Sequence, residues 1–372
     1  MSLRFVAVGD VAPDREDPAT IFDHVRDRLT AADLGYCQLE VNLTDRGERL
    51  PQARHTMRGK PEIADALVGA GLEIVSFAGN HTMDWGVTGM VDTLAHLDRA
   101  GALQVGAGMD IEAARSPVVV ERNGVRVGFL SVNSILPQNY WADEDKPGCA
   151  PMRGHTVYEQ IEHDQPGTPA RIHTFPHKED IAALIASIRA VRDRVDFLVL
   201  GHHAGIHFVP AVVPDYQRDV AHAAIDAGVD MVLGCHAHIL KGVEFYRGKP
   251  IIHSLANFAL DLKMTEAHAK SKGFREIQKL NPDWIPDLTS SYNFPPDSAM
   301  SFAVEAEIDG DRLVDLALVP VFIERDANPR FVAPDDPRFD RILSYLRTIT
   351  AQAGFSTDYQ ADGDVIRPGP RA

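Results

Sequence analysis

Apolar runs of strand length alternate with amphipathic patterns through the first third of the chain. The apolar runs are residues 3–8, 36–43, 72–78 and 103–105. Patterns with the helical period lie between them, at residues 18–32, 61–70 and 86–100. Gly101 follows the last of these patterns, at a position where helices commonly end. This order predicts a βαβαβ unit built on a parallel sheet.

The rest of the chain combines the same alternation with hairpins. Residues 178–195 and 216–227 predict helices, and the apolar runs 196–200 and 231–233 predict strands. Three Gly-containing turns predict hairpins, at Asn123-Gly124, Arg247-Gly248-Lys249 and Asp309-Gly310. Together these elements predict an α/β fold with four layers, an α/β/β/α sandwich with two central mixed β-sheets.

Two stretches have no clear period, at about 138–177 and 260–297, and both are rich in proline and charge. Irregular stretches of this length are often functional lids. We therefore expect a single domain over residues 1–355, with these two insertions covering the functional site and a last helix at 335–353. The polar, Pro/Gly-rich residues 356–372 predict a mobile C-terminal tail.

Composition and charge narrow the classes of function. The 372-residue chain is 45% hydrophobic and 24% charged, which is enough apolar sequence for a large core. Its net charge of −16 disfavours binding to nucleic acid or to a membrane surface, although bound metal ions would still allow a small anionic substrate. No apolar stretch reaches membrane-spanning length, and the three cysteines include no CxxC pair. These features predict a reduced, cytoplasmic protein and leave its oligomeric state open.

Polar side chains follow five of the predicted strands. They are Asp10, Glu40, the pair Asn80 and His81, the pair His202 and His203, and the pair His236 and His238. Because the carboxyl ends of strands in open α/β sheets gather where ligands bind, we expect these side chains to converge. Carboxylate, amide and imidazole donors without thiolate suit Mn²⁺, iron or Zn²⁺, and a pair of such ions activates water for hydrolysis. At each single position, a simple turn or a satisfied surface residue is the alternative.

Six sequence motifs, taken in order, resemble one protein family. They are GDV at 9–11, QLEVNLTD at 38–45, AGNHTMDWG at 78–86, HAG at 203–205, GCHAH at 234–238 and YRGKPIIHSLANF at 246–258. The set resembles the bacterial capsule-synthesis, or poly-gamma-glutamate synthesis, CapA family within the calcineurin-like metallophosphoesterase superfamily. That resemblance implies a dinuclear centre of two divalent metal ions, Mn, Fe or Zn.

The resemblance also implies a role for each matching residue. The implied metal ligands are Asp10, Glu40, Asn80, His203, His236 and His238, with Glu40 in the bridging position. His81 would act as general acid on the leaving group, and Asp84 would orient and charge its imidazole.

The chain departs from the family pattern beside the predicted site. The superfamily has a histidine where this chain has Ala12, so we expect a ligand-poor first metal position, for which His202 or Asp14 could compensate. The family has a glutamate where this chain has His207, which is expected to change the substrate. Further residues expected to contact the substrate or support the ligands are His202, His207, His55, Arg58, His253 and Asn257; for several of these, a surface or packed role is the alternative.

Three functions fit these observations. The first two are a phosphoesterase and an amide hydrolase, each acting on a small anionic substrate with the same metals. The third is a non-catalytic component of capsule synthesis that binds an acidic polymer. The retention of His81 together with Asp84 favours an enzyme, because a binding site does not require a proton donor.

Overall fold

The computed structural model describes residues 2–53 and 56–371 of the chain. The larger of its two central sheets has the strand order β21-β22-β19-β18-β1-β2-β5-β6, with β17 also paired to β1 and β20 to β19. These strands are β1 (Leu3–Ala12), β2 (Leu34–Leu39), β5 (Ile74–Ser76), β6 (Leu103–Val105), β17 (Asn257–Leu260), β18 (Met300–Asp309), β19 (Arg312–Ile323), β20 (Pro329–Phe331), β21 (Thr357–Asp362) and β22 (Val365–Pro370). Because β1 runs parallel to β2 and antiparallel to β18, the sheet is mixed.

The smaller central sheet is mixed as well, in the order β15-β16-β14-β13-β9-β8. Its strands are β8 (Val118–Arg122), β9 (Val125–Asn133), β13 (Phe197–His203), β14 (Met231–Cys235), β15 (Val243–Tyr246) and β16 (Lys249–Ile252). The predicted hairpin turns are confirmed: Asn123 and Gly124 have φ of 52° and 77°, and Arg247 and Gly248 have 51° and 77°. A turn with two successive residues of positive φ has a backbone twist that matches the right-handed twist of the strands that it joins.

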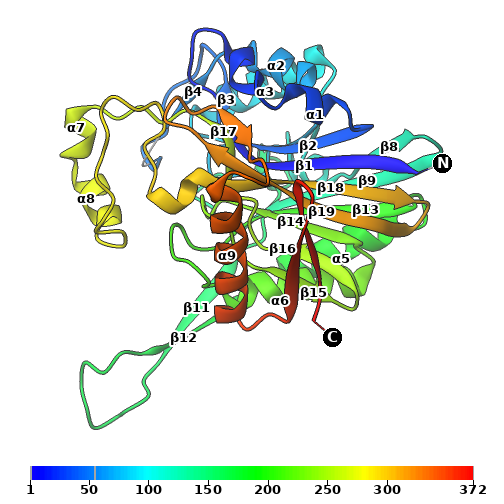
Figure 1. Ribbon diagram of the computed structural model, residues 1–372. Helices are drawn as coiled ribbons and strands as arrows, with labels where there is room; N and C mark the ends of the chain where they lie inside the picture. The colour runs from blue at the N-terminus through cyan, green and yellow to red at the C-terminus, as the bar shows by residue number, and fades with distance from the viewer. Residues whose placement is uncertain (1, 54–55, 372) are drawn as a thin grey trace.

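Helices cover the outer face of each sheet (Figure 1). The larger sheet carries η1 (Pro18–Phe22), α1 (Arg26–Thr30), α2 (Ile63–Gly69) and α3 (Gly86–Ala100), and the smaller sheet carries α4 (Ile111–Arg115), α5 (Lys178–Arg192) and α6 (Asp215–Ala227). Phe5 and Tyr36 of the larger sheet pack on Phe129 of the smaller sheet, with ring centroids 5.9 and 6.2 Å away. Separate apolar clusters fill the space under each helical layer. The predicted α/β/β/α arrangement is therefore confirmed.

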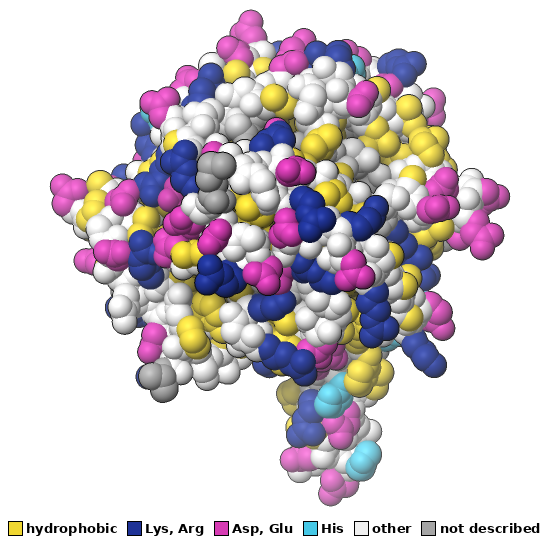
Figure 2. Space-filling model, turned by 90° about the vertical axis from the view of Figure 1, so that its right-hand side faces the viewer, with side chains coloured by type: hydrophobic (Ala, Val, Ile, Leu, Met, Phe, Trp, Pro, Cys, Tyr) yellow, Lys and Arg dark blue, Asp and Glu magenta, His cyan; other side chains and the backbone are white. Residues whose placement is uncertain are grey.

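Both insertions contain more regular structure than the sequence suggested. The segment 138–177 forms β10 (Gly148–Cys149), which pairs with β7 (Ala107–Gly108), and a hairpin of β11 (Gly154–Glu159) and β12 (Arg171–Pro176). This hairpin projects from the body of the molecule in Figure 1, and in Figure 2 it carries histidine and hydrophobic side chains. The segment 260–297 contains α7 (Glu266–Ala269) and α8 (Lys272–Gln278), and the 3-10 helix η2 (Pro296–Ala299) spans its end. Thr265 and Ser271 cap α7 and α8, which explains how such short helices form.

The prediction of a mobile tail at 356–372 is wrong, and the fold extends beyond residue 355. Residues 357–370 form the β21–β22 hairpin, which turns at Gly363 and adds to the edge of β19 through the pair Leu318 and Ile366. Tyr359 and Ile366 are buried, and they anchor the hairpin although the segment is otherwise polar. The preceding helix, α9 (Pro337–Gln352), packs against the same end of the core between the sheets. Within the described residues, no helix is both long and apolar enough to cross a membrane.

Candidate metal centre

Two buried carboxylates lie side by side where the first two parallel strands end. Asp10 is paired with Gln38 in the β1–β2 register, and the backbone N–H of Glu40 donates to the carbonyl of Val11. Asp10 is 0% exposed and Glu40 is 2% exposed. On the other side of β1, Gly9 allows the chain at Ala256 to pack closely, because a Cβ at Gly9 would lie 1.9 Å from the carbonyl oxygen of Ala256. Adjacent parallel strands thus bring both acids to one edge of the larger sheet.

Imidazoles from the smaller sheet face these carboxylates. β13 and β14 are parallel with His203 opposite Cys235, so His203 and His236 lie on neighbouring strand ends with ring centroids 4.9 Å apart. His236 and His238 have φ of 89° and 54°, and this tight turn presents both rings on one side. The Nδ1 atom of His238 lies 3.5 Å from Asp10 Oδ2. The facing ends of the two sheets therefore form a single cluster.

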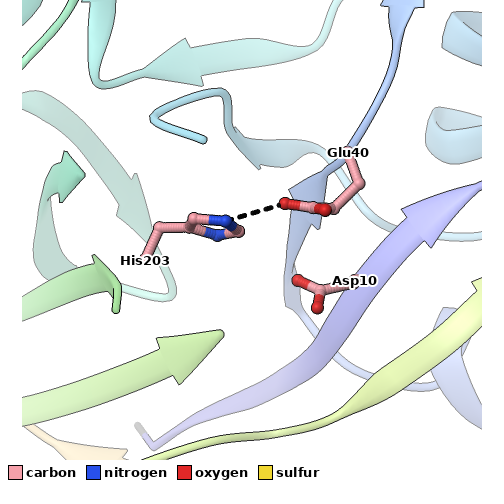
Figure 3. Close-up of side chains that lie close together, drawn as sticks. All are labelled: Asp10, Glu40 and His203. Carbon is pink, nitrogen blue, oxygen red and sulfur yellow. Dashed lines mark ion pairs between the residues drawn. The ribbon is translucent and has the colours of Figure 1, made fainter. Parts of the chain in front are cut away.

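Short contacts join the six predicted ligands into one continuous group. Glu40 Oε1 lies 3.0 Å from His203 Nε2, and one ligand atom each of Asp10, Glu40 and His203 all lie within 4.8 Å of one another (Figure 3). Asn80 Oδ1 lies 2.7 Å from His203 Nε2 and 3.0 Å from His236 Nδ1. The structure thus brings together Asp10, Glu40, Asn80, His203, His236 and His238, which are far apart in the sequence.

The electrostatics of this group favour a bound cation. Burial, together with the charge of Glu40, raises the pKa of Asp10 well above its usual range. Burial also raises the pKa of Glu40 to about 7, with His81 opposing the shift and Asp84 adding to it. Among the described residues, neither Asp10 nor Glu40 forms an ion pair with lysine or arginine, and Asp10 Oδ1 accepts no hydrogen bond. Carboxylates that are buried and ionised without such a partner are costly unless a cation binds them, so these residues fit divalent cations.

Two of the predicted ligand histidines, His203 and His236, favour the protonation state that metal binding requires. Burial and the neighbouring imidazoles lower the pKa of His203 and of His236 well below the usual value. Neutral imidazole is the form that donates a lone pair to a metal ion. Burial raises the pKa of Cys235 well above its usual value, so it remains a thiol beside the cluster.

His81 lies at the edge of the cluster in a hydrogen-bonded chain. Its Nδ1 is 2.6 Å from Asp84 Oδ2, and its Nε2 is 3.9 Å from Glu40 Oε2. Burial alone would lower the pKa of His81, but the charge and hydrogen bond of Asp84 and the charge of Glu40 outweigh it and raise the pKa to about 9. The Tyr140 hydroxyl donates to the other oxygen of Asp84 at 2.9 Å. Asp84 is therefore fixed from both sides, and it fixes the His81 ring.

Two tyrosines in this area were not identified from the sequence. Tyr140 is fully buried and comes from the first insertion, where no period or spacing pointed to it. Tyr292 comes from the second insertion, and its hydroxyl accepts from Asn257 Nδ2 at 2.7 Å. Asn257 in turn accepts from His238 Nδ1 at 2.7 Å, so this predicted supporting residue does contact the cluster. Each insertion therefore contributes one tyrosine to the hydrogen bonds around the cluster.

Two further candidate histidines occupy different positions. The ring of His207 lies 3.9 Å from that of His236, and its Nε2 has no hydrogen-bond partner among the described residues. Burial lowers the pKa of His207 to about 4, with His81 and Lys241 adding to the shift. His202 points elsewhere, with Nε2 2.9 Å from the Ser134 hydroxyl.

Three of the remaining candidates lie outside the cluster. The Nε2 atom of His253 lies 3.0 Å from Glu244 Oε2, and its ring stacks on Phe355. Arg58 is exposed, covers the ring of Trp85, and donates to backbone carbonyls. Asp14 is exposed as well, so neither it nor His202 stands in for the histidine that Ala12 replaces. His55 lies outside the described residues.

The two-sheet α/β/β/α fold and the carboxylate–imidazole cluster at its strand ends define an α/β protein with a candidate metal centre. Within that class, the chain belongs to the bacterial capsule synthesis protein PGA_cap family, whose family model matches residues 4–262. The predicted resemblance to the CapA family is therefore confirmed.

Relatives in this family are moderately similar. The "Probable polyglutamine synthesis accessory protein" of Mycobacterium tuberculosis is 30% identical over 244 residues, which cover 64% of this chain and 58% of that protein. The "PGA biosynthesis protein CapA" of Bacillus subtilis is 26% identical over 245 residues, covering 65% of this chain and 57% of that protein. The chain thus matches less than two thirds of the length of these relatives. A solved structure of a hypothetical protein from Thermus thermophilus aligns with 86% of this chain and 98% of its own, at 15% identity and a TM-score of 0.46.

Proposed function

We propose that the chain is a metal-dependent hydrolase that uses two divalent cations. The observation that carries this proposal is the pair of buried carboxylates, Asp10 and Glu40, which lie against neutral imidazoles and beside the His81–Asp84 pair. Two cations bound there would supply a more acidic water molecule and positive charge beside the scissile bond.

Each residue of the cluster has a distinct task in this proposal. Asp10 and His238 would hold one cation, and Asn80, His203 and His236 would hold the other. Glu40 would contact both, consistent with its position near Asp10 and His203. Mn²⁺, iron and Zn²⁺ all suit this mixture of oxygen and nitrogen donors.

His81 would deliver the proton to the leaving group. Asp84 occupies Nδ1, so the proton available for transfer is on Nε2, the atom nearer to Glu40. A pKa of about 9 keeps His81 protonated at neutral pH, and positive charge brought into the cluster would lower that pKa toward the range useful for a general acid. The Tyr140 hydroxyl would keep Asp84 in place while the proton leaves.

The scissile bond in this proposal is a phosphoester or an amide in a small anionic substrate. Both reactions need an activated water molecule and a protonated leaving group, which the same residues can serve. The names of the relatives refer to polyglutamine and capsule synthesis, which favours a glutamyl-type amide among the possibilities.

A second candidate function is a non-catalytic component that binds an acidic polymer during capsule synthesis. The names of the relatives as accessory and biosynthesis proteins favour it, as does Ala12 at a position where the superfamily supplies a ligand. The ordered His81–Asp84–Tyr140 chain argues for catalysis, because polymer binding does not require a held proton donor.

Metal content and product release together test the proposal. Elemental analysis of untreated protein is expected to find about two equivalents of manganese, iron or zinc, and a substrate panel assayed for both phosphate and amine release should identify the bond that is broken. His203→Ala should lose metal and turnover, whereas His24→Ala, at an exposed histidine, should keep both. Metal-loaded protein that releases neither product would refute the hydrolase and favour the polymer-binding component.

A further inference from the structure

A pocket lies between the second insertion and the loop that follows β13. Its volume is about 380 Å³, within the range of small-molecule sites. Phe208 and Ile239 line it on the side of the protein body, and residues 280–284 and 295–297 line it on the insertion side. Figure 1 shows that insertion, with α7 and α8, standing out at one side of the molecule.

The lining of this pocket is apolar and aromatic. The rings of Phe208 and Trp284 have centroids 5.7 Å apart and are only 6% and 5% exposed. Leu280 and three prolines add further apolar surface. Among the described residues that line the pocket there is no lysine, arginine or histidine. Asp283 and Asp297 are acidic, and Asp297 lies 3.8 Å from Arg341, which is outside the lining. A lining of this kind favours an uncharged apolar group and disfavours an anion.

One wall of the pocket lies beside the metal cluster. Phe208 and Ile239 follow His207 and His238 in the sequence, so two pocket residues are chain neighbours of the cluster histidines. The Phe208 ring lies 5.8 Å from the His238 ring and 5.2 Å from the His207 ring. One aromatic ring therefore contacts the cluster on one side and the pocket on the other.

A buried lysine holds this wall in position. Lys241 is 1% exposed, and its Nζ donates to the carbonyls of Val209 and Val212, the latter at 3.0 Å. The Phe208 N–H donates to the carbonyl of Ala237 at 3.1 Å. The loop includes positive φ at Phe208, 56°, a conformation that needs such support in a residue other than glycine. The pocket wall is therefore fixed before any ligand arrives.

We propose that this pocket binds the uncharged, apolar part of the substrate while the scissile group lies at the metal cluster. This inference rests on the proposed hydrolase function. It specifies an amphipathic substrate, in which an anionic phosphoryl or acyl end is joined to an aromatic or aliphatic group. It also distinguishes this site from one that accommodates a uniformly anionic polymer, since none of the described residues that line the pocket is positively charged.

Binding of 2-naphthol to metal-free protein in EDTA tests the pocket without requiring catalysis. Isothermal calorimetry should give a dissociation constant of about 1 mM or tighter, as expected for an apolar ligand of this size. Leu280→Asp adds a charge at a lining residue that is 61% exposed, and it should weaken binding about tenfold. Ile285→Asp makes the same change at a neighbour that is 81% exposed and outside the lining, and it should bind as the parent protein does. Thermal melting checks that both variants fold.

Activity measurements then connect the pocket to catalysis. For metal-loaded protein, Leu280→Asp should lower kcat/KM for 1-naphthyl phosphate about tenfold and leave that for glycerol phosphate within twofold. Absence of 2-naphthol binding, or equal binding by all three proteins, would overturn the pocket assignment. Equal losses of kcat/KM on both esters would overturn its role in the reaction. Normal 2-naphthol binding without hydrolysis of any ester or amide would instead refute the proposed function and leave the pocket intact.

Discussion

Replacing Glu40 by glutamine should make the metal-free protein more stable at alkaline pH. Burial, opposed by His81 and reinforced by Asp84, raises the pKa of Glu40 from 4.5 to about 7. Between pH 4.5 and about pH 7, the Glu40 carboxyl carries a proton in the folded protein but not in the unfolded chain. The stability from that proton is complete below pH 4.5 and is lost as the pH rises through 7. Glutamine keeps the shape of the side chain but cannot ionise.

The expected magnitude follows from the same pKa values. A pKa difference between 4.5 and about 7 corresponds to about 3 kcal/mol of stability lost by the metal-free parent protein at pH 8. A cation at one hundred times its dissociation constant would then return about 2.7 kcal/mol per site. Glu40→Gln removes a charged ligand, so it should gain less from the cation than the parent does. The order of stability of the two proteins should therefore change when metal is added.

Urea unfolding followed by circular dichroism can measure both effects. The parent, Glu40→Gln and Glu48→Gln, an exposed control, would be unfolded in EDTA at pH 5 and pH 8, and again at pH 8 with MnCl₂. If the parent and Glu40→Gln lose the same stability between pH 5 and pH 8 in EDTA, the carboxyl is not the buried acid described above. Equal stabilisation of both by Mn²⁺ would show that Glu40 does not bind the cation.

Three other predictions concern catalysis, acid stability and packing. His81→Ala should lower kcat by about 100-fold or more while elemental analysis finds unchanged metal content; parent-like turnover would refute the proton-donor role. Burial would raise the pKa of Glu244, but hydrogen bonds from two histidines and an arginine outweigh it and lower the pKa to about 2. The stability that Glu244 contributes is thus present above pH 4.5 and lost as the pH falls toward 2. Glu244→Gln should therefore lower the free energy of unfolding by about 3 kcal/mol at pH 7 and by much less at pH 2. A loss of the same size at both pH values in urea unfolding would contradict this. Gly9→Ala should lower the free energy of unfolding by about 3 kcal/mol in the same assay, because its Cβ would meet a backbone carbonyl. Gly273→Ala, whose Cβ would meet open space on a helix, should be neutral or stabilising. Similar effects of the two substitutions would refute the packing argument.

The parts of the site that sequence could predict are those fixed by the ends of strands. Asp10, Glu40, His203 and His236 each lie at the end of an apolar run, and parallel pairing brings the ends of such runs to one edge within each sheet. The Asn123-Gly124 turn was predictable for a similar reason, because a two-residue connection with positive φ restricts which residues can form it. Local geometry sufficed in these cases.

The parts that sequence could not predict depend on contacts between distant segments. Tyr140 lies in a stretch without period, and only the folded chain brings its hydroxyl to Asp84, 56 residues earlier in the sequence. His253 follows a strand, as the ligand histidines do, but it faces Glu244 and Phe355 instead of the cluster. Strand alternation does not say which face of an internal strand will meet the metal site and which will meet the C-terminal segment.

Because β1 pairs with strands on both sides, the choice of a truncated fragment for expression has a structural consequence. The match to the family model ends at residue 262, but β18 and β19 follow it and complete the sheet beside β1. Expressing residues 1–262 alone would leave the backbone of β1 with open hydrogen-bonding groups along Leu3–Ala7, and would remove the apolar cover from Phe5 and its neighbours. Such a fragment should collect in inclusion bodies, whereas one that ends at residue 371 keeps every strand partnered as it is here.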